Sequence, residues 1–159
     1  MHNYDINSEH SKTNQFSPGP VDDTEELYRI TLHPEHIKDG VILPTAISTE
    51  DLECRGYSVE RKNFVQISLM RETAKVQIGK KPESRKFAEV AFFYCDYVRQ
   101  LKLDDHRAFL VIDDAKEDDA AHASIYSAIK PAPKSILRKL RTILSPVLEN
   151  RTSLDLGIT

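Results

Sequence analysis

A run of carboxylates that leads into a histidine is the first feature of the sequence that could do chemistry. The stretch "DDAKEDDAAHASIY" places five acidic residues ahead of His122. Asp113 directly follows the apolar run "FLVI", and a carboxylate that leaves a buried strand can hold Mg²⁺. The small and acidic residues that come next are more typical of a solvent-exposed loop. We therefore favour a loop, expect no metal site, and consider His122 separately as either a structural histidine or an acid–base group.

The histidine pair in "HPEH" is a second candidate. Zinc proteases place two histidines four residues apart on a helix, with a glutamate base between them. His33 and His36 are three residues apart, and Pro34 favours a turn over a helix. We expect a local structural role for both histidines rather than a zinc site.

A third candidate combines Arg29, Ser58 and Arg61. Arg29 lies inside "ELYRITL" among apolar neighbours, where an arginine is rare unless it is ion-paired or binds an anion. Ser58 and Arg61 follow a glycine in "GYSVER". An arginine on a first strand and a serine on a later one resemble the layout of ADP-ribosyltransferase-like folds, which bind NAD. The acidic residue of such enzymes is not identified, because Glu60, Glu89 or neither could supply it.

Basic residues on the last helical segment are candidates for binding. In "PKSILRKLRTILSPVLENR" the apolar residues form one helical stripe, and Lys134, Arg138 and Arg141 lie on the other side. This basic face either is a solvated surface or contacts an acidic partner or nucleic-acid phosphates.

The composition argues against several function classes. The 159 residues suffice for one domain with its own core, and 40% hydrophobic with 30% charged residues are globular values. A net charge of -3 disfavours general nucleic-acid binding, which usually needs a basic domain. The sequence has no GxGxxG, P-loop or GxSxG motif, and its five glycines leave little scope for a phosphate-binding glycine loop. We expect no cofactor.

Cysteine usage and hydropathy bear on the compartment. Cys54 and Cys95 lie far apart without metal-binding spacing, which indicates free thiols in a reducing environment. The N-terminal residues include no apolar signal segment, and the longest apolar run, "VAFFYC", is too short to cross a membrane. The sequence therefore predicts a cytoplasmic protein that does not associate with membranes.

Hydrophobic patterning predicts the elements that position these residues. Residues 1–24 are polar and proline-containing, which favours a disordered head. "ELYRITL", "YSVER", "VAFFYC" and "HASIYSAI" are typical of strands, and the continuous run "FLVI" of a central strand. Residues 63–79 are one helix in the preferred interpretation and two strands in the alternative. We expect a single α+β domain at residues 25–151, with a mixed sheet of four or five strands and two longer helices. Residues 152–159 are expected to form a frayed tail.

Three of these stretches together suggest a family. "LYRITLHPEHIKDGVILPTAIS", "GYSVER" and "AFLVIDDAKEDDAAHASI" resemble a family of small bacterial proteins in which an LYR strand, a GxSV step and a late HAxI element recur in that order. The family has no assigned activity, so the resemblance implies a bacterial cytosolic domain. It groups Arg29, Ser58, Val59 and His122 as one set.

Two functional hypotheses follow. The first is a non-enzymatic binding or interaction module whose partner is another protein, with nucleic acid not favoured. The second is a small enzyme that acts on NAD, a nucleotide or nucleic acid, in an ADP-ribosyltransferase-like or nuclease-like manner. In that enzyme Arg29 would bind phosphate and His122 would act as acid or base beside Ser58.

Overall fold

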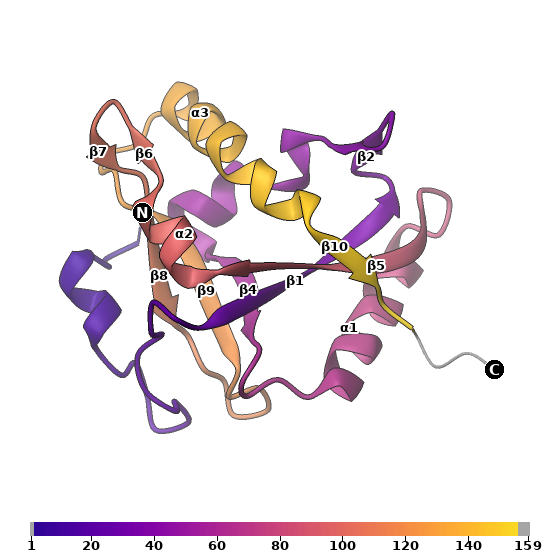
Figure 1. The fold of residues 1–159 in the computed structure, drawn as a ribbon, viewed down its shortest axis with the longest axis horizontal. Coiled ribbons are helices and arrows are strands. Elements are labelled where there is room, and N and C mark those ends of the chain that lie inside the picture. The colour runs from indigo at the N-terminus through magenta and orange to yellow at the C-terminus, as the bar shows by residue number, and fades with distance from the viewer. Residues whose placement is uncertain (1, 156–159) are drawn as a thin grey trace.

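A six-stranded antiparallel sheet in the order β10-β5-β1-β4-β9-β8 organises the chain (Figure 1), and the computed structural model describes residues 2–155. The strands of this sheet are β1 Glu26–Pro34, β4 Tyr57–Arg61, β5 Arg85–Tyr94, β8 Phe109–Asp113, β9 His122–Ser127 and β10 Arg151–Ser153. The helices are α1 Ile67–Lys80, α2 Cys95–Gln100 and α3 Lys134–Leu144. The α+β class with two longer helices is confirmed, and Ile67–Lys80 is one helix rather than two strands.

Short elements complete the chain. Two hairpins lie outside the main sheet, β2 Ile37–Lys38 with β3 Val41–Ile42 and β6 Lys102–Leu103 with β7 His106–Arg107. The single-turn helices are η1 Ile6–His10, η2 Pro44–Ala46, η3 Asp51–Arg55 and η4 Ser145–Glu149. The last of them continues α3 with tighter 3₁₀ geometry where Pro146 cannot donate a helical hydrogen bond.

The main core lies on one face of the sheet. Alternate residues of the strands point to this face, because successive side chains of a strand lie on opposite sides. Helix α3 covers this face with its apolar stripe. The residues from β4, β9 and α3 in this core are Tyr57, Val59, Ala123, Ile125, Leu137, Leu140 and Leu144.

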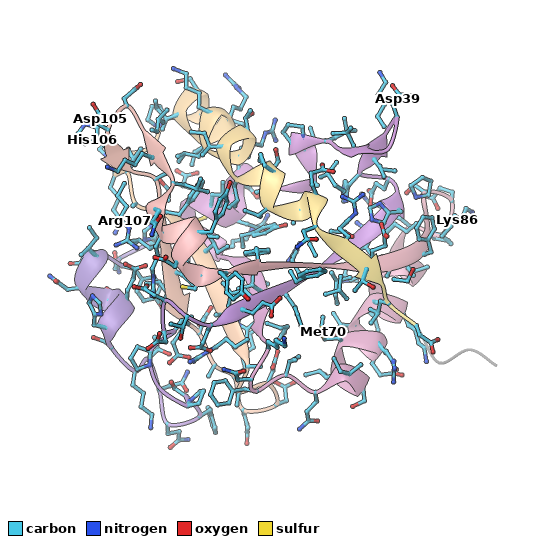
Figure 2. The ribbon with its side chains drawn as sticks, in the orientation of Figure 1. Asp39, Met70, Lys86, Asp105, His106 and Arg107 are labelled. Atoms are coloured by element: carbon cyan, nitrogen blue, oxygen red, sulfur yellow. The ribbon has the colours of Figure 1, made fainter. Side chains whose placement is uncertain are left out.

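The opposite face is covered in two separate places. At one end α1 packs against β1 and β5, with Ala74 in a cluster with Leu32 and Ala88. Met70 of the same helix is also buried (Figure 2). At the other end, Tyr4 of the N-terminal segment packs on Leu110 and Tyr126. The region of β4 and β9 between these two patches carries polar side chains, among them Ser58 and His122.

The sheet opens between β1 and β4. Only Leu27↔Arg61 and Tyr28↔Glu60 are paired across these strands, whereas β1 is paired with β5 over its whole length. Figure 1 shows that β1, β5 and β10 turn away from β4, β9 and β8 beyond this contact. The split leaves the first half of β4 without a neighbour on its β1 side.

The N-terminal segment does not show the disordered head that its composition suggested. Residues 2–24 follow a defined path along β8 and β9, with Glu9 and Val21 buried. Glu9 accepts hydrogen bonds from the backbone of Val111 and from Arg99 and Arg107. A polar segment is held here mainly by buried ion pairs and hydrogen bonds, which apolar content alone does not predict.

Three further expectations about the sheet differ from the structure. The sheet has six antiparallel strands rather than a mixed set of four or five, because Arg151–Ser153 adds β10 to the edge at β5. The "FLVI" strand, β8, is the opposite edge and not central. It is buried on both faces because the N-terminal segment covers it. The predicted frayed tail is paired at residues 152–153, and residues 156–159 lie outside the described residues.

Candidate active site

A cleft of about 470 Å³ occupies the split between β1 and β4. Side chains from both faces of β1 line it, so the cleft passes through the sheet rather than lying on one side. Helix α1 and the loop before β9 complete its walls. The polar side chains that line it are Tyr28, Arg29, Thr31, His36, Ser58, Glu60, Thr73, Gln77, Arg85, Lys116, Asp118, Asp119 and His122.

Ser58 and His122 are in hydrogen-bonding contact inside the cleft. Their positions follow from the β4–β9 register, in which Glu60 is opposite His122 and Ser58 is opposite Ser124. The two side chains project from the same face on a diagonal of neighbouring strands. The distance from Ser58 Oγ to His122 Nε2 is 3.1 Å.

Asp114 determines which nitrogen of His122 carries the proton. His122 Nδ1 lies 2.8 Å from the backbone carbonyl oxygen of Asp114, and a carbonyl can only accept a hydrogen bond. Nδ1 is therefore the protonated nitrogen, and Nε2 accepts the hydroxyl proton of Ser58. The Asp114 carboxylate lies 3.7 Å from Nδ1 and is itself held by the Ser124 hydroxyl at 2.7 Å. Ser58, His122 and Asp114 thus form a chain in the order hydroxyl, imidazole, backbone carbonyl, with the Asp114 carboxylate near Nδ1 but beyond hydrogen-bond distance.

Arg29 borders the same cleft from the other strand. Its Nη1 donates to the backbone oxygen of Ser58 at 2.8 Å, and its guanidinium carbon lies 4.2 Å from the ring centroid of Tyr57. Within residues 2–155, no carboxylate forms an ion pair with Arg29. Of the two explanations for an arginine among apolar neighbours, an ion pair is thus not found among the described residues. Guanidinium N–H groups that are not used by the Ser58 carbonyl or the Tyr57 side chain can donate to an anion in the cleft.

Glu60 and Asp119 place two carboxyl groups beside the Ser58–His122 pair. Burial, together with the neighbouring Asp119 carboxyl, raises the pKa of Glu60 to about 9. Asp119 is fixed by the turn before β9, where its Oδ1 accepts from the backbone of Ala121 at 3.2 Å. The geometry and burial of the pair thus favour retention of a proton at neutral pH.

The cationic end of the cleft contains a second histidine. Burial lowers the pKa of His36, and this outweighs the opposing effect of Glu35, whose carboxylate is 3.6 Å away. Arg85 contacts Glu35 as well, at 2.5 Å, so its charge is largely matched. At this end Arg29 is a cation with no carboxylate partner among the described residues.

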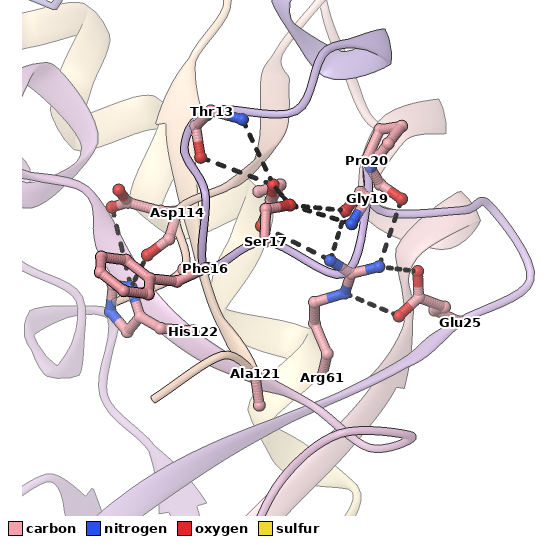
Figure 3. Close-up of polar contacts among 12 residues, drawn as sticks. Thr13, Phe16, Ser17, Gly19, Pro20, Glu25, Arg61, Asp114, Ala121 and His122 are labelled. Carbon is pink, nitrogen blue, oxygen red and sulfur yellow. Dashed lines mark hydrogen bonds and ion pairs between the residues drawn. The ribbon is translucent and has the colours of Figure 1, made fainter. Parts of the chain in front are cut away.

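Two residues singled out in the sequence have structural contacts away from the cleft. Arg61 is 2% exposed and forms two hydrogen bonds to Glu25 and others to the backbone of Gly19 and Pro20 (Figure 3). Asp113 is also buried, 3.5 Å from Arg61, and accepts from Ser17 of the N-terminal segment. Both residues fasten that segment to the sheet.

The remaining sequence candidates lie outside the cleft. Helix α3, which covers the face of the sheet with the main core, carries Lys134, Arg138 and Arg141. None of the three lines the cleft. His33 is buried, with Nε2 at 3.1 Å from Glu89 and 2.8 Å from Thr31 Oγ1. Among the described residues, no group of three or more His, Cys, Asp or Glu side chains is arranged to hold a metal ion.

Sequence reasoning brought together Arg29, Ser58 and His122, and the structure places all three around one cleft. It missed Asp114 and Asp119 as parts of the site, because both were assigned to a solvated loop. Only the β4–β9 register, which pairs Glu60 with His122, could have indicated that the loop before β9 returns to the site.

Comparisons with protein-family models, with curated protein sequences and with solved structures gave no match for this chain. No helix among residues 2–155 is long and apolar enough to cross a membrane.

Proposed function

We propose that the protein is a small enzyme that cleaves a phosphate-bearing compound of the nucleotide type in the β1–β4 cleft. Ser58 is the nucleophile, His122 is its general base, and Arg29 binds the anionic group of the substrate. The observation that carries the proposal is the 3.1 Å contact between Ser58 Oγ and a His122 nitrogen that is free to accept a proton.

The proposed reaction begins with proton transfer. His122 Nε2 takes the hydroxyl proton as Ser58 Oγ bonds to the electrophilic atom of the substrate, and the bond to the leaving group breaks. The Asp114 carbonyl and carboxylate both face Nδ1, so they stabilise the imidazolium that forms. Water then attacks the covalent intermediate and releases Ser58, which recovers its proton from His122.

Arg29 supports a phosphate-bearing substrate. A guanidinium presents several N–H donors in one plane, which suits the oxygens of a phosphate group. Its contact with the Tyr57 ring and the Ser58 carbonyl holds the planar group at the edge of the cleft. A cleft of about 470 Å³ has the size of ordinary small-molecule sites.

Reaction with a fluorophosphonate tests the nucleophile without knowledge of the substrate. Ser58 Oγ should displace fluoride and form a phosphonate ester, which intact-mass measurement and peptide mapping locate. Ser58→Ala should abolish the label, and His122→Gln should slow labelling at least about 100-fold. The matched controls are Ser153→Ala and His106→Gln, both at exposed positions, and these should react like the unaltered protein. Lack of a label on Ser58, or equal labelling of His122→Gln, would contradict the proposal.

A substrate panel tests the class of compound. The protein is incubated with NAD, ADP, ATP and a short single-stranded RNA, and products are separated by chromatography. Arg29→Gln should raise KM for the compound that is cleaved by about tenfold or more, whereas Arg138→Gln, on the exposed side of α3, should not. An unchanged KM in Arg29→Gln would show that Arg29 does not hold the anionic group.

An interaction module remains the second proposal, favoured by apolar side chains on the surface. Phe64, Ile67 and Val76 are 43%, 42% and 58% exposed and lie on or beside α1. Such residues are common at protein contacts, so the partner would be another protein. Location in a bacterial cytoplasm also stays a prediction.

A further inference from the structure

Glu60 lines the same cleft as Ser58 and His122. It follows Ser58 by two residues on β4, so both side chains are on the same sheet face, and its register partner on β9 is His122. The cleft lining therefore contains a nucleophile, a base and a third ionisable group on two adjacent strands.

The contacts of Glu60 indicate a shared proton. Its Oε2 is fully buried and has no hydrogen-bond donor among the described residues. The neighbouring group is the carboxyl of Asp119, and an ionised carboxylate can only accept. Both residues line the cleft, and a proton held between the two carboxyl groups would give Oε2 a partner, as in paired carboxylates of other active sites.

We propose that Glu60 and Asp119 share one proton and that Glu60 is the catalytic residue that donates it to the leaving group. This role rests on the proposed function, because it completes the reaction that Ser58 and His122 begin.

Proton transfers balance over the two steps. In the first, Ser58 passes its proton to His122 and bonds to the substrate, while the leaving group departs with the proton of Glu60. In the second, water attacks the covalent intermediate and gives a proton to ionised Glu60, and His122 returns its proton to Ser58. Both groups end in their starting states, and no further reactant is needed.

The groups around Glu60 keep its proton in place at neutral pH. Burial and Asp119 raise the pKa of Glu60, and Lys116 of the same loop opposes them more weakly. His122 faces Glu60 from β9, and Tyr28 faces it from β1. The loop itself is held by two backbone hydrogen bonds between Lys116 and Asp119, at 2.9 and 3.1 Å.

Carboxyl carbon NMR tests whether the proton is present. The Glu60 resonance, assigned by its loss in Glu60→Gln, should titrate near pH 9 instead of near the ordinary value of 4.5. Asp119→Asn should lower the midpoint by at least about one pH unit, because the negative partner is gone. Glu83→Gln, at an exposed position, should leave it unchanged. Titration of Glu60 near 4.5 overturns the inference.

A pair of phosphonate probes tests the donation of the proton. A diphenyl phosphonate releases phenol, which needs a proton, whereas a bis(4-nitrophenyl) phosphonate releases a stable anion. Labelling of Ser58 in Glu60→Gln should fall at least about tenfold more with the first probe than with the second. In Glu60→Asp, which keeps a titratable group, the losses of labelling with the two probes should differ less than in Glu60→Gln. This partial recovery would also show that β4 is intact.

The outcomes separate the two proposals. Failure of every probe to label Ser58 in the unaltered protein overturns the proposed function and the role of Glu60 with it. Labelling of Ser58 with an equal loss for both probes in Glu60→Gln overturns only the role of Glu60.

Discussion

Glu60 shows at the scale of a residue how burial of an ionisable group can oppose stability. The unfolded chain ionises this carboxyl near pH 4.5, whereas the folded protein retains the proton up to about pH 9. The folded state thus binds more protons than the unfolded state between these values. The contribution of Glu60 to stability is therefore largest below pH 4.5, falls as pH rises, and reaches its lowest level above pH 9.

Glu60→Gln should remove this dependence. The amide cannot ionise, and it can donate to the Asp119 carboxylate as the shared proton does. We expect little difference between the variant and the unaltered protein at pH 4. Above pH 4.5 the variant should gain about 1.4 kcal/mol of relative stability for each pH unit, or roughly 5 kcal/mol at pH 8. Urea denaturation at a series of pH values from 4 to 9 measures the difference. A constant difference across that range would show that Glu60 ionises normally in the folded protein.

The two thiols should differ sharply in reactivity. Burial raises the pKa of Cys95 to about 12, and the side chain is inaccessible, whereas Cys54 is exposed on η3. Ellman's reagent at pH 8 should therefore modify one thiol in the folded protein and both in urea. In Cys54→Ala the folded protein should give no reaction. A second thiol that reacts at the same rate as Cys54 would contradict the burial of Cys95.

Residue types predicted one part of the site and not the other. Arg29 was recognisable because a charged side chain interrupts an apolar alternation, and His122 because it begins one. Glu60, Asp114 and Asp119 resemble ordinary surface acids in sequence. Their roles depend on burial, on a turn and on strand register, which composition does not determine.

The split between β1 and β4 is the decisive feature at the scale of elements. Strands β1, β4 and β9 were each predictable from alternation, but their pairing was not. Pairing ends after Tyr28↔Glu60, so the β1 side of β4 at Ser58 faces a cleft instead of a neighbouring strand. The sequence of β8 did not reveal that it is an edge strand. A strand that is covered by another segment and a strand with two sheet neighbours are both buried, so both have a continuous apolar run.

Gly56 allows β4 to begin directly beside β9. Its φ is +87°, and a Cβ there would lie 2.7 Å from Ser124 Oγ and 2.9 Å from the hydroxyl of Tyr126. Gly56→Ala should reduce the free energy of unfolding by about 2 kcal/mol, through backbone strain and displacement of Ser124. Urea denaturation measures this loss, and Gly79→Ala, where a Cβ meets nothing within 4 Å, is the control. Equal stability of the two variants would argue against this close approach.

At the scale of the whole molecule, the N-terminal segment completes the sheet. An edge strand such as β8 presents unpaired backbone groups that favour association with another chain. Here the Glu9 carboxylate accepts from the Val111 amide at 2.8 Å and binds Arg99 and Arg107, so the edge is covered. A polar segment that sequence rules assign to disorder thus acts as part of the fold.

Glu9→Ala should destabilise the protein by about 3 kcal/mol. Removal of one partner leaves Arg99 and the Val111 amide buried with fewer acceptors, and an uncompensated buried charge is costly. For a chain of 159 residues this corresponds to a decrease in Tm of roughly 6–12 °C. Glu83→Gln should change Tm little, since that side chain is exposed. A Tm for Glu9→Ala within 2 °C of the unaltered protein would contradict the buried network.

Deletion of residues 1–17 tests the segment as a whole. The shortened chain lacks the hydrogen bonds of Glu9 with β8, of Ser17 with Asp113 and of His2 with the Ser127 carbonyl. The β8 edge and the Leu110–Tyr126 patch therefore become exposed. We expect self-association in analytical ultracentrifugation and fast hydrogen exchange at the Val111 amide, which Glu9 protects in the full chain. The cleft residues keep their own contacts, since none of the polar groups that line it comes from residues 2–17. A shortened chain that stays monomeric with a protected Val111 amide would show that the segment is dispensable for the fold.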